Sequence, residues 1–329
     1  MLDTRPPRTI DITRAERGMA RRRRRRITAS VALVALVVAG GWALLPRPAR
    51  EPAPPPLRPS TLTVLLVRGG SKPLVAVVGS MGDPGPAALA IPAGIAITMP
   101  AGGEGTMADA TALPAPSMRT AVSNLVGAWA EHYAVVELRA LSRAAESSGL
   151  EETRTILSGP DATERWPGIL ESILAGREHL SASALAESDD AAAVAEALAG
   201  VSGAEVEELP AVLGQGGALR PDPEAADRLV VRLFGLAAAP TSVVVMNASG
   251  SPAAAELVAE RLLPAGFRLV VSSDAEAFPT TAIVASTHGD RATAEQVREL
   301  LGVGEVVVSR VPSGLGEVTV MIGEDLGNG

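Results

Sequence analysis

The chain has 329 residues, a formal net charge of −8 and no cysteine, which excludes disulfide bonds and thiolate metal sites. Its seven aromatic residues (three Trp, three Phe and one Tyr) are too few for the stacked-ring platforms that commonly bind sugars or single-stranded nucleic acid. Hydrophobic residues make up 47% of the chain, which is enough for packed cores.

Positive charge is concentrated at the N-terminus. Residues 1–26 carry ten Arg against three acidic residues, a net charge of +7, and six of these arginines are consecutive, Arg21–Arg26. The rest of the chain has 19 basic and 34 acidic residues, a net charge of −15. Such an acidic remainder argues against nucleic acid as a partner.

An uncharged segment follows the arginines directly. At ~1.5 Å per helical residue, the 19 residues 27–45 span close to the ~30 Å hydrocarbon core of a bilayer, which predicts a single transmembrane helix. The positive-inside rule then places the N-terminus in the cytoplasm and residues 46–329 outside the plasma membrane. The alternative is a cleaved signal peptide, with a cleavage site at 41–43.

Proline dominates the next segment. Seven of the residues 46–59 are proline, which is typical of a semi-extended linker of polyproline character. We expect this linker to hold the following domain close to the membrane.

Residues 60–236 alternate between strand and helix patterns, which predicts an α/β domain. Ser117 is predicted to cap one of its helices, and 214–217 is predicted to be a flexible loop. Strands are predicted at 61–67, 74–79, 87–91, 95–99, 132–138 and 205–209, and helices at 117–126, 139–148, 161–200 (with a break near Gly176) and 223–234.

A second α/β domain is predicted over residues 241–323. An internal repeat supports it, because a shift of 39 residues superposes two copies of a strand, a glycine turn and an amphipathic helix. The order βαββαβ with one extra edge strand predicts a small ferredoxin-like sandwich with a pseudo-twofold axis. Strands are predicted at 241–246, 267–272, 281–286, 305–309 and 317–322, and helices at 251–263 and 290–301.

The last segment resembles the LytR C-terminal domain. The residues that carry the resemblance are the turn Asn247–Gly250, the Ala265–Phe267 motif, Asp274 with Phe278, and the closing strand before Gly323–Asp325. In actinobacterial envelope proteins this domain commonly follows a LytR-CpsA-Psr (LCP) domain.

Residues 60–236 resemble an LCP domain. The resemblance rests on 91–110, 122–150 and 205–235, and the predicted anchor and linker match the layout of that family. It implies an α/β/α fold. It also implies transfer of a polymer from a polyprenyl pyrophosphate carrier to peptidoglycan, with arginines on the pyrophosphate and acidic residues that hold Mg²⁺ or deprotonate the acceptor.

The sequence departs from the family where that chemistry is expected. Ala93 and Gly94 stand in place of the family's Arg-Asp pair, and Gly168 stands where a second arginine is expected. Because two phosphates need fixed cations, the loss of these arginines removes much of the transition-state stabilisation. We therefore expect a degenerate LCP domain, a pseudoenzyme with no catalytic residues, no bound metal and no cofactor.

Two groups of residues are candidates for ligand binding. Arg68, Arg119 and Arg165, with Asp161, would line a residual pocket for an anion, although scattered surface arginines are the ordinary alternative. Asn247, Ser249 and Gly250 open a helix whose N–H groups could bind an anion, and the ordinary alternative is a helix cap by Ser249 or Ser251. The histidines are isolated, and His132 and His288 are expected in the core or at the surface.

The most favoured function is a non-catalytic role in binding and assembly during biogenesis of cell-wall glycopolymer or peptidoglycan. Expected partners are the membrane through 27–45 and a polyprenyl-phosphate lipid, a wall glycan or envelope proteins. One alternative is a diverged phosphotransferase, which would need Mg²⁺. Another is a binding module in which the C-terminal domain, similar in element order to SPOR domains, recognises glycans or proteins.

Overall fold

A computed structural model describes residues 60–68, 73–80, 85–137, 139, 165–175, 185–201, 203–214, 217–236, 240–272, 277–309 and 316–327. The predicted transmembrane helix, the proline linker and all but the first residue of the helix predicted at 139–148 lie outside these residues. Across the described parts of the chain, no helix combines the length and apolar character needed to cross a bilayer. Leu57–Gly329 forms one compact unit, whose described residues include a six-stranded sheet, a five-stranded sheet and two two-stranded hairpins.

The first sheet has six strands in the order β7-β6-β1-β2-β3-β8. The central strands are antiparallel neighbours, and β6 and β8 are parallel to β1 and β3. Most of the strands match the sequence predictions within one or two residues. Their bounds are β1 Thr61–Arg68, β2 Leu74–Ser80, β3 Ala87–Ile91, β6 His132–Glu137, β7 Leu185–Ser188 and β8 Glu205–Glu208.

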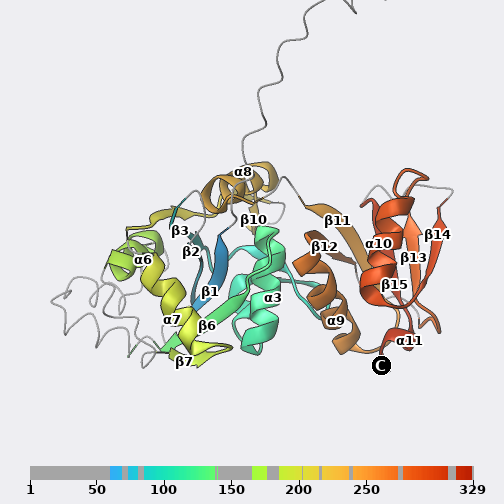
Figure 1. Cartoon of the computed structure of the whole chain (residues 1–329), viewed down its shortest axis with the longest axis horizontal. Helices are drawn as coiled ribbons and strands as arrows, with labels where there is room; N and C mark the ends of the chain where they lie inside the picture. The colour runs from blue at the N-terminus through green and yellow to red at the C-terminus, as the bar shows by residue number, and fades with distance from the viewer. Residues whose placement is uncertain are drawn as a thin grey trace, which may run out of the picture. The chain divides into compact units, whose positions relative to one another are not determined.

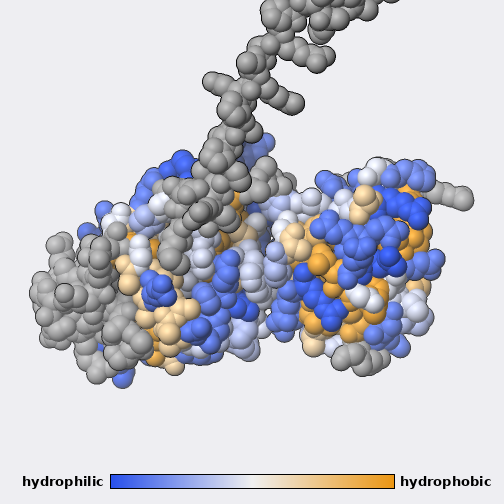
Figure 2. All heavy atoms as spheres, viewed as in Figure 1, coloured by the Kyte–Doolittle hydropathy of each residue, from blue (hydrophilic) through white to orange (hydrophobic). Residues whose placement is uncertain are grey.

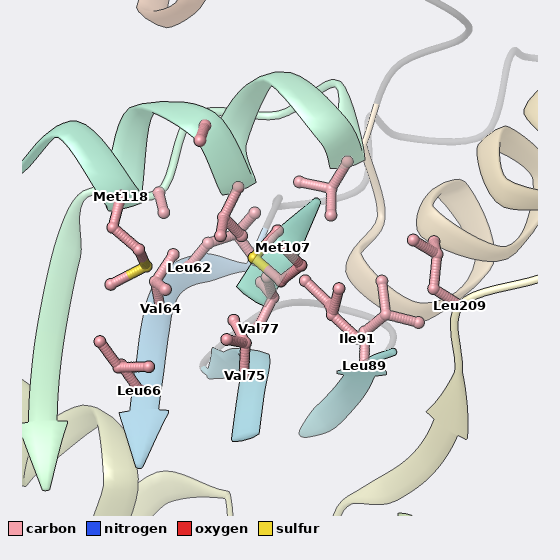
Figure 3. Packing of buried hydrophobic residues seen from close by; sticks show 14 of the residues in the cluster. Leu62, Val64, Leu66, Val75, Val77, Leu89, Ile91, Met107, Met118 and Leu209 are labelled. Atoms are coloured by element: carbon pink, nitrogen blue, oxygen red, sulfur yellow. The ribbon is translucent and has the colours of Figure 1, made fainter. Parts of the chain in front are cut away.

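Helices cover both faces of this sheet. Residues of β1 alternate between two cores: Leu62, Val64 and Leu66 pack against α3 and α8, whereas Leu65 and Val67 pack against α6 and α7. Figure 3 shows the first of these cores, in which Met118 of α3 lies next to Val64. The predicted α/β/α architecture of 60–236 is therefore confirmed (Figure 1). The helices are α3 Ala115–Val126, α6 Trp166–Ala175, α7 Ala191–Gly200 and α8 Pro223–Phe234.

Two predictions within this part were wrong. Residues 161–200 were predicted to be helical with a single break. The structure instead has a strand, β7, between α6 and α7, and this strand pairs with β6. Ser117 does not cap a helix, because α3 begins earlier, at Ala115. Pro116 suits the first turn, where a backbone N–H has no partner within the helix. Ser117 lies within the first turns of α3, and its hydroxyl donates to Glu256 Oε1 at 3.2 Å.

Two small hairpins lie beside this sheet. One joins β4 (Ala96–Thr98) to β5 (Glu104–Thr106) and leads into the short helix α2 (Met107–Ala110). The other pairs β9 (Ala211–Leu213) with β10 (Leu219–Pro221) as antiparallel strands. Of the loop predicted at 214–217, residues 215 and 216 lie outside the described residues. An isolated bridge between Ile95 and Leu219 connects the two hairpins.

The second sheet has five strands in the order β12-β11-β15-β13-β14. Helices α9 and α10 contact each other and share one hydrophobic core with the sheet (Figure 1). On the surface of this part, hydrophobic residues show between hydrophilic ones in the space-filling view (Figure 2). The elements are β11 Thr241–Asn247, α9 Pro252–Leu262, η4 Leu263–Ala265, β12 Phe267–Ser272, β13 Ala282–Ala285, α10 Arg291–Leu301, β14 Glu305–Val308, β15 Val318–Ile322 and α11 Glu324–Gly327.

This topology is not the predicted ferredoxin-like one. In a ferredoxin-like sheet the two strands of each βαβ unit are split apart. Here β11 and β12 are parallel neighbours, and so are β13 and β14. The extra strand β15 lies in the centre, parallel to β11 and antiparallel to β13, rather than at an edge. The predicted order of elements holds, but the pairing differs because β15 fills the gap between the two units.

The internal repeat corresponds to these two βαβ units. Its matched helix positions are buried in both copies: Ala255 with Ala294, Val258 with Val297, and Leu262 with Leu301. The shared glycine is not used in the same way. Gly250 has a φ of 72°, a conformation that favours glycine, whereas Gly289 is absent from the positive-φ glycines of the described residues.

Candidate functional site

A cleft of about 280 Å³ opens where β4, β10, α3 and α8 meet the edge strand β12. Clefts between packed units that combine apolar walls with a few polar groups are common ligand sites. The lining residues come from the strands β4, β5, β10 and β12 and the helices α3 and α8. They are Ala96, Ile97, Thr98, Glu104, Asn124, Leu125, Arg220, Pro221, Pro223, Ala226, Asp227, Arg268, Leu269 and Val270.

The walls of the cleft are mainly apolar. Ile97, Ala226 and Leu269 are buried and form its deeper part, whereas Val270 is 39% exposed and lies at the surface. The apolar character follows from the sequence pattern, since β4 and α8 turn their hydrophobic residues towards the first core.

Asn124 of α3 closes the edge of β12 at the back of the cleft. Its Nδ2 donates to the carbonyl of Leu269 at 2.9 Å, and its Oδ1 accepts from the Leu269 N–H at 2.7 Å. The carboxamide thus takes the place of a neighbouring strand residue. Since Asn124 is only 8% exposed, both bonds are made away from water.

A bidentate ion pair forms a second link across the cleft. Arg268 of β12 donates from Nη2 to Asp227 Oδ1 at 2.6 Å and from Nη1 to Oδ2 at 3.2 Å, and both side chains are 21% exposed. Two parallel bonds to a carboxylate fix the guanidinium in its plane. This pair therefore forms a rigid and locally neutral wall.

The third charged group of the cleft is much more open. Arg220 Nη2 donates to Glu104 Oε2 at 3.2 Å, with the side chains 50% and 69% exposed. Exposed pairs of this kind contribute about 0–1 kcal/mol. The cleft thus contains two ion pairs: the exposed Arg220–Glu104 pair, which can open at low cost, and the bidentate Arg268–Asp227 pair. Among the described residues, no group of three His, Asp or Glu side chains is arranged to hold a metal ion.

Arg68, a predicted ligand-binding residue, has a structural contact. It is the last residue of β1, and its Nη2 donates to the carbonyls of Thr111 at 3.3 Å and Leu113 at 3.4 Å. These bonds tie the end of the strand to the loop that precedes α3.

Arg119 lies in a different polar cluster. Its Nη1 donates to Asp189 Oδ2 at 3.3 Å and to the Glu131 carbonyl at 3.1 Å, and its guanidinium lies 4.6 Å from the centre of the Trp129 ring and 5.8 Å from that of Tyr133. His132 Nδ1 is 3.6 Å from the same Asp189 oxygen. Burial, with the nearby Glu187 and Asp189 carboxylates, raises the pKa of the Tyr133 hydroxyl.

The predicted arginines do not converge. Glu131, beside Arg119, accepts from the N–H of Leu62 near the start of β1, whereas Arg68 ends the same strand. Six residues of strand at ~3.3 Å each separate these points by about 20 Å. Arg165 is exposed at the start of α6, next to Trp166 in the core on the opposite face of the sheet. Asp161 lies outside the described residues.

Asn247, Ser249 and Gly250 form a self-contained turn before α9. Asn247 Oδ1 accepts from the N–H and the hydroxyl of Ser249 at 3.1 and 2.7 Å, and Ser249 Oγ accepts from the N–H of Ser251 at 3.1 Å. Two N–H groups that an anion would use are therefore already bonded. The predicted helix cap by Ser249 or Ser251 is not seen. Ser251 is the residue before α9 and makes no side-chain cap bond, and Ser249 bonds the N–H of Ser251 rather than one within the helix.

Ala93 and Gly94, which replace the family's Arg-Asp pair, follow β3. Ala93 is 3% exposed, and its carbonyl accepts from the N–H of Ala108 at 2.9 Å. Gly94 is exposed and has no atom within 4 Å of where a Cβ would stand. The backbone is thus well ordered by contacts here, and it carries no charged side chain.

The sequence interpretation missed the cleft residues Asn124, Arg220, Asp227 and Arg268. Only a weak signal was present, since polar residues within the apolar patterns of α3 and β12 suggest partners elsewhere in the chain. The partners lie 41 to 145 residues apart in the sequence, so their pairing could not be predicted.

The fold defines an α/β protein in which an α/β/α part precedes a two-layer part made of two βαβ units. Residues 241–326 match the family model described as LytR cell envelope-related transcriptional attenuator, which confirms the predicted resemblance of this part to the LytR C-terminal domain. Among curated proteins, no relative matches the chain.

Solved structures of LCP proteins are similar to part of the chain. The LytR-Csp2A-Psr enzyme from Actinomyces oris has 14% sequence identity and a TM-score of 0.41, over 57% of this chain and 96% of that one. The family protein YwtF (TagT) with bound octaprenyl pyrophosphate lipid has 11% identity and a TM-score of 0.41, over 57% and 95%. The C-terminal domain of RV0431 has 32% identity and a TM-score of 0.21, over 27% and 75%.

Proposed function

We propose that this chain is a non-catalytic envelope protein that binds and assembles components during biogenesis of wall polymers. The LytR C-terminal domain family supports a cell-envelope role. The proposed location is the plasma membrane, with residues 27–45 as a single anchor and residues 46–329 outside, as the arginine-rich N-terminus predicts.

One observation carries the non-catalytic part of the proposal: seven arginines of the described residues are paired with carboxylates, and Arg68 donates to backbone carbonyls. A pyrophosphate leaving group needs several cations aimed at one point. Arginines that already bond to carboxylates and lie on different elements do not direct several positive charges at one point. The pairs are Arg119–Asp189, Arg220–Glu104, Arg228–Glu224, Arg232 with Glu205 and Glu207, Arg268–Asp227, and Arg291 and Arg298 with Glu295.

The experiment is a carrier-cleavage assay on the full chain in detergent, with a polyprenyl pyrophosphate-linked saccharide, Mg²⁺ and a peptidoglycan acceptor. We expect no release of polyprenyl phosphate above the background without protein. An active LCP enzyme, assayed in parallel, shows that the substrate is competent. Mg²⁺-dependent turnover by the purified chain would overturn the proposal.

The diverged phosphotransferase is a second candidate, and the Arg119 cluster is the observation that favours it. This cluster joins an arginine, a carboxylate (Asp189) and His132 at one end of β1. If turnover is found, Arg119→Gln and Asp189→Asn should abolish it, whereas Arg228→Gln, in an exposed pair on α8, should not. The SPOR-like alternative loses its structural basis, because the observed strand order differs from the predicted one.

A further inference from the structure

We propose that the cleft between β4, β10, α8 and β12 binds a short zwitterionic peptide, a di- or tripeptide with small apolar side chains and free termini. This inference rests on the proposed binding function and adds to it a class of ligand.

The size of the cleft sets an upper limit on the ligand. A volume of about 280 Å³ holds roughly nine water molecules at ~30 Å³ each, and it lies just below the ~300–1,000 Å³ of sites for drug-sized ligands. Only a short part of a polymer chain or a prenyl lipid would be held within that volume. A peptide of two or three small residues fits inside it.

The walls set the character of its side chains. Ile97, Leu125, Ala226 and Leu269 present aliphatic surface, and the lining contains no aromatic ring. Aliphatic walls favour methyl-sized side chains, because burial of apolar surface contributes about 25 cal/mol per Å². The lack of rings argues against a stacked sugar as the ligand.

The exposed ion pair of the cleft indicates which terminal groups the ligand carries. The exposed Arg220–Glu104 pair can open at little cost, since such pairs are weak in water. Arg220 would then bind a terminal carboxylate, and Glu104 a terminal ammonium group. A ligand with both charges can bond to both Arg220 and Glu104, whereas a ligand with one charge bonds to only one of them.

The other charged and amide groups of the cleft bond within the protein, apart from Arg268 Nε, which is buried and has no hydrogen-bond partner among the described residues. Asp227 and Arg268 hold each other through two bonds. Asn124 occupies both backbone groups of Leu269, so the peptide does not extend the sheet at that residue. Recognition therefore depends on the termini and on the apolar fit.

The test is a calorimetric titration of the full chain in detergent with trialanine, and with the same peptide N-acetylated, C-amidated or both. We expect saturable binding of trialanine, weakened about tenfold when either terminus is blocked. Arg220→Gln should weaken trialanine binding but not further weaken the C-amidated form. Glu104→Gln should do the same for the N-acetylated form. Val270→Trp, which places a large ring in the cleft, should abolish binding. Arg228→Gln is the matched control, because it also breaks an exposed ion pair but lies on α8 outside the lining of the cleft.

Three results would overturn the inference: no heat of binding at millimolar trialanine, equal binding of the doubly blocked peptide, or binding unchanged by Arg220→Gln and Glu104→Gln. The two charge variants alter an exposed pair, so their folding is preserved even if Val270→Trp unfolds. A chain that binds trialanine and also cleaves the carrier contradicts only the proposed function. A chain that does neither contradicts only this inference.

Discussion

The side chain of Asn124 on α3 satisfies both backbone groups of Leu269 on β12, so at this residue of the edge strand a carboxamide takes the place of a neighbouring strand. An open strand edge is a template for unwanted pairing with other chains. Here the first sheet's own helix covers it. This contact also fixes the back wall of the cleft, which ties the shape of the candidate site to the packing of the LytR C-terminal domain.

Asn124→Leu is therefore expected to destabilise the chain. Leucine has a similar shape but leaves the Leu269 N–H and C=O buried without partners, which costs about 1–3 kcal/mol for such a group. Urea unfolding followed by circular dichroism measures the change. Ser117→Ala, which removes a partly buried bond to Glu256, is the milder comparison and should cost about 1 kcal/mol or less. Equal stability of Asn124→Leu and the parent chain would contradict the role of Asn124.

The Asp227–Arg268 pair should show measurable coupling in a double-mutant cycle. Its two short bonds and its partial burial favour about 1–2 kcal/mol, more than an ordinary surface pair. The variants are Asp227→Asn, Arg268→Gln and the double variant, each unfolded with urea. The control cycle on Glu224 and Arg228, which are 86% and 72% exposed, should give no more than about 0.5 kcal/mol. Coupling that is no larger than in the control cycle would show that the pair does not hold the two sheets together.

Local patterns predicted most of the elements but not their pairing. The helix at 223–234 was predicted to the residue, because Asp222, Pro223 and Gly235 mark its ends. Strand β7 was missed, since LAES has no β-branched residue and only its pairing with β6 makes it a strand. The place of β15 could not be predicted either. Periodicity identifies a strand, but its neighbours depend on contacts between distant segments.

The candidate site was harder to predict than the fold. Arg68 and Arg119 were predicted to bind a ligand because of their charge. In the structure Arg68 bonds to two backbone carbonyls and Arg119 bonds to Asp189, and the sequence does not show these partners. The cleft combines residues from α3, α8, β10 and β12, none of which carries a motif. Such a site becomes visible only when tertiary packing brings these elements together.

Gly323→Ala should test the closing motif of the LytR C-terminal domain. A Cβ at Gly323 would lie 2.3 Å from the carbonyl carbon of Thr280 and 2.6 Å from the nitrogen of Thr281, so backbone must move. We expect a loss of about 1–3 kcal/mol in urea unfolding. Gly94→Ala is the matched control, because its Cβ meets nothing within 4 Å, and it should change stability by less than about 0.5 kcal/mol. A neutral Gly323→Ala would show that the loop before β13 can yield.

The last prediction concerns Tyr133, the only tyrosine of the chain, whose phenolate absorbance therefore reports a single residue. Burial first, and then the Glu187 and Asp189 carboxylates, raise its pKa above the usual value of about 10, while Arg119 lowers it. The folded chain thus holds the proton more tightly than the unfolded chain. This stabilises the fold below about pH 10, and the contribution is lost as the pH rises through the raised pKa. Alkaline titration should give a midpoint above that of the chain in urea, and Asp189→Asn should lower it. A midpoint equal to that of the unfolded chain would contradict the buried, acid-flanked position of this hydroxyl.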